Sequence, residues 1–325
     1  MRNKILNTLS ITLLALSIAQ TAKAQPDYDY IERKGWSLGM NVGIGDLWGD
    51  VGTKSPIEHY KNDNYGDYVN AFGGVFVRYA FRPSFVFRAA VNYGTVAAGD
   101  NMNENLARKT LKYESDEVQR YQRNLDVKTN IWEGSMMFEI NPLRFNPLSR
   151  TAKMHFQPYV LVGIAGYHFV SKGRYIAKDG SAGASNGQYI KLYDLHIEGD
   201  GFKGAGMPAA YSRWQMAVPL GIGGKWDLSP KMAIGIEYVY RMAFTDYLDG
   251  VSQNYIDPKL YKENGLTDQQ AKVAAAMSDK SWELDPNKVH KAGEKRGNNS
   301  GADAYSTISI SLFYKFKSRA NPWWE

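Results

Sequence analysis

The sequence predicts an all-β protein, an eight-stranded antiparallel up-and-down transmembrane β-barrel with long extracellular loops and short periplasmic turns. Three observations predict this fold class. Apolar and polar residues alternate with a period of two in one segment after another. The connections between these segments are either short or long in a regular order, and the chain begins with an export signal.

The alternation recurs in eight segments, each of which we predict to be one strand. From residue 36 to residue 44, one face is apolar and the other carries Ser37, Gly39, Asn41 and Gly43, whereas a helix would repeat every three or four residues. The expected strands cover residues 36–44, 74–81, 85–93, 131–140, 159–170, 214–226, 232–242 and 307–316. In the segment 159–170 both faces are apolar or small, so its inward side is left open.

The connections alternate between two kinds. The strands meet through short turns at residues 82–84 and 229–230, and through a moderate link that contains Pro142 and Pro147. The long connections are residues 46–67, 97–126, 172–213 and 245–304. Short turns on one side and long loops on the other are typical of an outer-membrane barrel, and an even number of strands places both ends of the barrel in the periplasm.

Two local features lie inside the long loops. Thr267 and Gln270 form a capping-box pattern that predicts a short helix through Met277. The segment 181–187 is small and polar, so we expect it to be mobile.

The first residues have the pattern of a secretory signal peptide. Arg2 and Lys4 are positive, residues 5–19 are mainly apolar, and residues 22–24 are a small-x-small cleavage site. The apolar run is shorter than the about 20 residues of a membrane helix. The expected domains are residues 1–24 as signal peptide, 25–35 as N-terminal segment, 36–316 as outer-membrane barrel and 317–325 as periplasmic tail.

The composition supports an exported barrel. The 325 residues include no cysteine, which excludes disulfides and thiolate nucleophiles. The 22 Tyr, 13 Phe and 8 Trp suit the aromatic girdles of a membrane barrel, and the 31 Gly suit a narrow lumen. The net charge of +6 is modest and the acidic residues are interspersed, so we expect outer-membrane lipid, and no nucleic acid, as a partner.

The polar face of the strands carries charges that we expect inside the barrel. A lumen of eight strands has room for side chains but not for many bulky ones, so the Gly-rich, charged face is predicted to point inward; the inverted arrangement is a soluble barrel. Arg78 and Arg88 are equidistant from the turn at Pro83, so they should face each other across the hairpin and need carboxylates nearby. The candidates for lumenal ion pairs are Arg78, Arg88, Glu133, Glu139, Glu237 and Arg241. We expect these residues to plug the lumen; a gated polar pore is the alternative.

One motif follows the seventh strand. Residues 237–252 contain the run Thr245-Asp246-Tyr247-Leu248-Asp249; with residues 45–50 and 157–160, it resembles the PorG-like outer-membrane barrel family of the Bacteroidetes. The resemblance spans residues 36–316 and implies an eight-stranded barrel that is the outer-membrane partner of periplasmic proteins in the type IX secretion and gliding apparatus. From the residues themselves, we expect Asp246 and Asp249 to accept backbone amides and Tyr247 to lie in the interfacial belt. Two carboxylates alone do not make a calcium site.

Three classes of function remain. A structural or assembly barrel comes first, and the tail residues Trp323 and Trp324 would contact either a partner or the membrane interface. A surface- or ligand-binding barrel that acts through its long loops is the alternative. A lipid-modifying enzyme is least favoured, because His168 and Ser171 lie on opposite faces of one strand. We therefore expect no catalytic residues, no cofactor and no metal site.

Overall fold

The computed structural model describes residues 34–110, 115–146, 155–177, 186–204 and 206–316. The predicted signal peptide, nearly all of the segment 25–35, most of the segment 181–187 and the tail with Trp323 and Trp324 lie outside the described residues.

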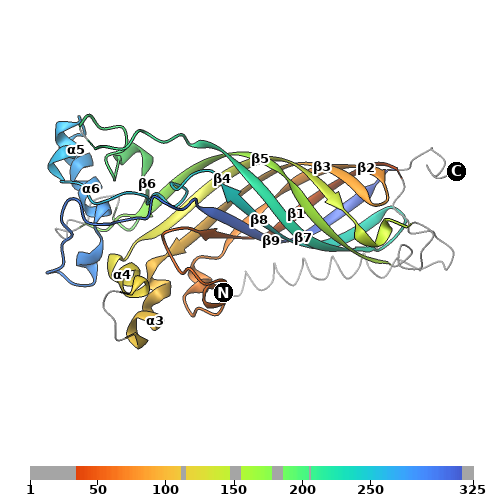
Figure 1. The fold of residues 1–325 in the computed structure, drawn as a ribbon, viewed down its shortest axis with the longest axis horizontal. Coiled ribbons are helices and arrows are strands. Elements are labelled where there is room, and N and C mark those ends of the chain that lie inside the picture. Colours follow the sequence, from red (N-terminus) through yellow and green to blue (C-terminus); the bar gives the residue numbers. More distant parts are fainter. Residues whose placement is uncertain (1–33, 111–114, 147–154, 178–185, 205, 317–325) are drawn as a thin grey trace.

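Eight strands form a closed antiparallel barrel, which confirms the predicted fold class (Figure 1). Each strand pairs with its neighbour in the chain, and the last strand pairs with the first to close the sheet. The barrel strands are β1 (Gly35–Trp48), β2 (Asn70–Arg82), β3 (Phe85–Gly99), β4 (Asp126–Ile140), β5 (Phe156–Arg174), β7 (Trp214–Asp227), β8 (Met232–Ala243) and β9 (Ala304–Lys315). A short strand, β6 (Tyr189–Lys191), pairs with the end of β5.

The long loops gather at one end of the barrel, and the short connections lie at the other (Figure 1). The loops carry several short helices, and α6 begins with the predicted capping box of Thr267 and Gln270. The α-helices are α2 (Pro56–Tyr60), α3 (Glu104–Lys109), α4 (Asp116–Arg123), α5 (Lys259–Glu263) and α6 (Asp268–Ser278). The 3-10 helices are η1 (Tyr65–Asp67), η2 (Asp100–Asn103), η3 (Pro142–Arg144), η5 (Tyr193–Leu195) and η6 (Ser281–Glu283).

Most strands extend farther into the loop end than the alternation predicts. β3 continues to Gly99 and β5 to Arg174. At the end of β3, Val96, Ala97 and Ala98 are all buried, because the loops cover the face that points outward lower in the barrel. Where both faces are buried, the period of two disappears from the sequence.

The two faces of the barrel wall differ as predicted. Exposed apolar side chains cover the outside on every strand of the barrel; they include Trp36, Val75, Val91, Trp132, Ile164, Trp214, Ile236 and Ile310. The inside carries charged, small and aromatic side chains. For β5, the structure settles the open question, because Tyr159, Leu161 and Tyr167 are buried inside the barrel while Val160 and Ile164 are exposed.

Within the described part of the chain, no helix has the length and apolar character needed to cross a membrane.

Candidate functional site

The centre of the lumen holds a buried network of charged side chains. Arg78 on β2 and Arg88 on β3 are paired across the hairpin, as the turn at Pro83 predicts. Arg78 donates to both oxygens of Glu139 at 3.0 and 2.6 Å. Arg88 donates to both oxygens of Glu237 at 2.9 Å and to Glu139 at 3.3 Å. The network therefore joins β2 and β3 to β4 and, across the lumen, to β8.

Two further residues complete this network and were not named as candidates from the sequence. Lys225 on β7 donates to Glu139 at 2.8 Å, and the hydroxyl of Tyr159 on β5 donates to Glu237 at 2.5 Å. The alternation places Lys225 on the inner face beside the outward Trp226, and this was the signal that could have identified it. Glu139 thus binds three cations, which come from three other strands of the barrel.

Polar contacts continue toward both ends of the lumen. Nearer the loops, Glu133 forms an ion pair with Arg241 and accepts hydrogen bonds from Asn92 at 2.8 Å and Tyr305 at 2.7 Å. At the opposite end, Asp227 binds Arg144 at 3.1 Å and Lys315 at 2.6 Å. Charged side chains therefore span the lumen in three levels.

Aromatic rings fill the space beside the central arginines. Phe76 and Phe313 pack edge to face with ring centroids 5.3 Å apart. The guanidinium of Arg88 lies 4.5 Å from the centre of the Phe76 ring, and that of Arg78 lies 4.9 Å from the Phe313 ring. Arg78, Glu139 and Lys225 are fully buried at this level of the barrel.

The long loops fold into a cap over one end of the barrel. An apolar core runs without interruption from the upper lumen into the loops: Tyr167 and Tyr305 in the barrel wall belong to the same cluster as Leu195, Tyr261 and Met277 in the loops. The cap and the loop end of the barrel therefore share one apolar core.

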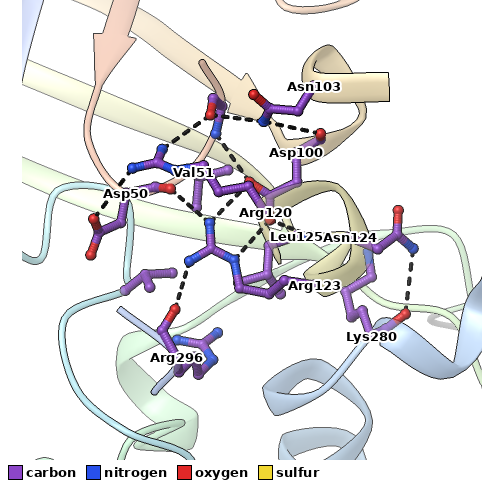
Figure 2. A network of polar contacts seen from close by, with 12 residues as sticks. Asp50, Val51, Asp100, Asn103, Arg120, Arg123, Asn124, Leu125, Lys280 and Arg296 are labelled. Carbon is purple, nitrogen blue, oxygen red and sulfur yellow. Dashed lines mark hydrogen bonds and ion pairs between the residues drawn. The ribbon is translucent and has the colours of Figure 1, made fainter. Parts of the chain in front are cut away.

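Buried arginines tie the loops of the cap together, as Figure 2 shows. Arg123 on α4 binds both oxygens of Asp100 at 2.9 Å. The same guanidinium donates to the backbone carbonyls of Asp50 at 2.7 Å and Arg296 at 2.6 Å. Arg120 donates to the carbonyl of Gly52 at 3.0 Å. One helix thus joins the first, second and fourth long loops.

The run Thr245–Asp249 anchors the fourth loop at the barrel rim. Asp249 accepts the amides of Val51 at 2.9 Å and Val251 at 2.8 Å, the contact expected of this residue. Its neighbour Leu248 is fully buried. The amide of Leu248 donates to the carboxylate of Asp303 at 2.8 Å. The hydroxyl of Thr245, at the start of the motif, accepts the amide of Tyr247 at 3.2 Å.

Two expectations about this motif are wrong. Asp246 is half-buried, its Oδ2 atom accepts no hydrogen bond, and Asp303 instead binds the amides at this rim. Tyr247 does not face the interfacial belt but stacks on Tyr211, with ring centroids 4.2 Å apart. The third loop covers Tyr247, and nothing in the local sequence indicates that contact.

Asp249 and Asp303 form a close pair of buried carboxyl groups. A Cβ atom on Gly49 would lie 2.5 Å from an oxygen of each, so only glycine fits between them and β1. Burial and the nearby charge of Asp50 raise the pKa of Asp249 to about 7. Burial and the charge of Asp249 raise the pKa of Asp303 well above its usual range. Two such groups share a proton more readily than they bear two charges.

Other groups with reactive side chains have structural contacts. His168 packs against Trp214 on the outside, whereas Ser171 points inward and donates to the carbonyl of Leu248 at 2.8 Å. In the first loop, the hydroxyl of Thr53 lies 3.4 Å from His59, whose other ring nitrogen lies 3.3 Å from Asp46. All three of these side chains are buried. The described residues include no group of three or more His, Asp or Glu placed to hold a metal ion.

We predict that Glu139→Gln strongly destabilises the barrel. The change leaves Arg78 and Lys225 without their counter-charge in a buried site, which costs about 3–5 kcal/mol. The control Glu104→Gln removes an exposed i,i+4 pair with Arg108 and should change the free energy of unfolding by less than about 1 kcal/mol. Urea unfolding in lipid vesicles measures both. Equal stability of the two variants would contradict the central role of Glu139.

We also predict that the cap is more stable at pH 5 than at pH 8. An aspartate with a raised pKa keeps a proton in the folded state that the unfolded chain has already lost. Stability is therefore present at low pH and is lost as the pH rises from the ordinary value of 3.8 through about 7. The stability of the cap can be measured by amide-exchange protection at Leu248 and Val251, corrected for the intrinsic pH dependence of exchange.

The variant Asp303→Asn should flatten this pH dependence, because an amide replaces one member of the pair. Asp268→Asn, at an exposed position, should leave the dependence unchanged. A cap whose protection rises with pH would contradict the proton-sharing pair.

Comparison with known proteins gives structural likeness alone. No protein-family model matches the sequence, and no curated protein matches it. The attachment invasion locus protein Ail of Yersinia pestis is similar at 11% identity and a TM-score of 0.34, over 88% of this chain and 100% of that one. Neisserial surface protein A gives 9% identity and a TM-score of 0.36, over 88% and 99% of the chains. A major outer membrane protein from Thermus thermophilus gives 11% and 0.36, over 87% and 100%.

Proposed function

We propose that this protein is a closed outer-membrane barrel with a structural role, in which the membrane-spanning strands anchor a folded cap at the cell surface. The observation that carries the proposal is the buried network around Glu139 and Glu237, which fills the lumen from wall to wall. Paired charges and packed phenylalanines occupy the centre of this barrel, which supports a structural role better than the conduction of ions or solutes.

The outer surface supports the membrane location. Apolar side chains face outward on all eight strands, and cross-strand neighbours such as Ile236 and Ile310 are both about half exposed. A surface of this kind is unfavourable in water and matches the hydrocarbon of a bilayer. With the short turns in the periplasm, the cap lies on the extracellular side.

We predict that the purified protein forms no steady channels in planar bilayers, because Arg78, Glu139 and Lys225 block the centre of the lumen. The readout is single-channel conductance in salt solution. A general porin added to the same preparation serves as the control that insertion and detection work. A large, steady conductance from this protein would contradict the structural role and favour the pore.

A second proposal places the barrel in an assembly, as the outer-membrane partner of periplasmic proteins in a type IX secretion apparatus. The run Thr245–Asp249 favours it, because this part of the sequence resembles the PorG-like barrels and holds the rim of the barrel together through Asp249. In such an assembly, the periplasmic proteins would contact the periplasmic end of the barrel. The cap would remain exposed outside the cell.

We predict that affinity purification from native membranes recovers periplasmic secretion proteins with the full chain. A variant that ends at Phe316 lacks Trp323 and Trp324 and should recover less of these proteins, because aromatic residues often anchor interfaces. Quantitative mass spectrometry of the two preparations gives the measurement. Absence of such proteins from both preparations contradicts the assembly role, and equal recovery contradicts docking through the tail.

A further inference from the structure

A polar cavity of about 280 Å³ lies in the cap where the first, second and fourth long loops meet. Its lining brings six cationic side chains together with three carboxylates. The cations are Lys54, Arg120, Arg123, Lys288, Lys295 and Arg296. The carboxylates are Asp50, Asp116 and Glu294. Two of these cations bind carboxylates outside the lining, Arg123 at Asp100 and Arg296 at Glu198. The six cations therefore face five carboxylates, and the small excess of positive charge in a concave site attracts anions.

The arginines of the cavity are held in fixed positions. Arg120 and Arg123 come from adjacent turns of α4, and Figure 2 shows their guanidinium groups side by side, facing the segments of Asp50 and Arg296. Backbone carbonyls accept several of their hydrogen bonds, and these acceptors bring no formal negative charge. Arg296 is fixed by Glu198 at 2.6 Å, outside the cavity lining. Side chains fixed in this way lose little conformational entropy when a ligand binds.

A second observation, the buried hydroxyl of Tyr255, also points to a ligand in this cavity. Only 4% of this residue is exposed, it lines the cavity, and its hydroxyl has no hydrogen-bond partner in the structure. The ring is held by stacking on His290, with centroids 4.4 Å apart and an angle of 5° between the planes. A buried hydroxyl without an acceptor is unfavourable, and an anionic oxygen in the cavity would provide that acceptor.

The carboxylates of the lining are largely engaged by other groups. Asp116 lies between Lys54 at 2.9 Å and Arg120 at 2.8 Å. Asp50 accepts the backbone amide of Asn298 and lies 3.7 Å from Arg120. Glu294 is exposed. On the fourth loop, opposite α4, Arg296 is paired with Glu198, so Lys288 and Lys295 supply the positive charge for an anion.

We propose that this cavity binds a phosphate group, either as the free ion or carried by a sugar-sized ligand. Donors reach the cavity from three loops, an arrangement that suits a tetrahedral anion better than a planar carboxylate. The volume is slightly below the ~300–1,000 Å³ of most ligand pockets, so the ligand is small. This site goes beyond the structural role proposed above, since a non-conducting barrel needs no ligand.

Isothermal titration calorimetry on the full chain in detergent tests the site with inorganic phosphate and glucose 6-phosphate as probes. Glucose and glucuronate are the neutral and carboxylate comparisons. Tyr255→Phe keeps the stacked ring but removes the hydroxyl, and should weaken binding of both phosphate probes about tenfold. Lys295→Gln, at the exposed rim, should weaken it several-fold. The matched control Lys291→Gln lies in the same loop but outside the lining, and should bind like the wild type.

The outcomes separate clearly. Tighter binding of glucose 6-phosphate than of phosphate supports a phosphorylated sugar as the source, and equal binding supports the free ion. Failure of both probes to bind, identical affinity in all variants, or glucuronate bound as tightly as glucose 6-phosphate overturns the proposal. Without ligand, Tyr255→Phe should melt at or above the wild-type temperature, because it removes a buried, unpaired hydroxyl; this controls for misfolding. The bilayer recordings do not depend on any of these results.

Discussion

The ion pairing of Glu139 with cations from three other strands is the interaction on which the barrel interior depends. A charge in a closed lumen is costly unless opposite charges lie beside it, so each strand that contributes a cation constrains where the others stand. Arg78, Arg88 and Lys225 meet this requirement only when the sheet is closed at the observed stagger. The rings of Phe76 and Phe313 then fill the remaining space against the guanidinium groups. The ion pairs in the lumen, the register of the strands and the packing of the rings therefore depend on one another.

In the cap, too, buried charges require partners. Its buried cations, Arg123 and Arg296, are bound by Asp100 and Glu198 and by backbone carbonyls from other loops. Loops as long as these lose much conformational entropy on ordering, and the apolar cluster that continues upward from Tyr167 and Tyr305 offsets that loss. The surface of the protein that would meet the exterior is therefore a folded layer rather than a set of separate loops.

Much of the barrel could be predicted from the sequence, because alternation and connection length are local properties. The pairing of Arg78 with Arg88 follows from the turn at Pro83, and an inward position for Lys225 follows from its outward neighbour. The carboxylate that binds each arginine could not be assigned from the sequence. Glu237 reaches Arg88 across the lumen from β8, whereas Glu139 on the neighbouring strand β4 binds both Arg88 and Arg78. The inward side of β5 was ambiguous because small and apolar residues occupy both faces. The stacking of Tyr247 on Tyr211, and the cavity beside α4, depend on loop contacts that leave no period in the sequence.

The distribution of the lumenal charges along the chain has a consequence for biogenesis. The first four strands bring two arginines and Glu139 together, while Lys225 and Glu237 arrive only with β7 and β8. A sheet of these four strands alone would leave Arg88 without Glu237 and Glu133 without Arg241, and charges without their buried partners are costly in hydrocarbon. Closure of the barrel and pairing of its lumenal charges therefore coincide. The C-terminal third of the chain has to join the sheet before the lumen can be buried in the membrane.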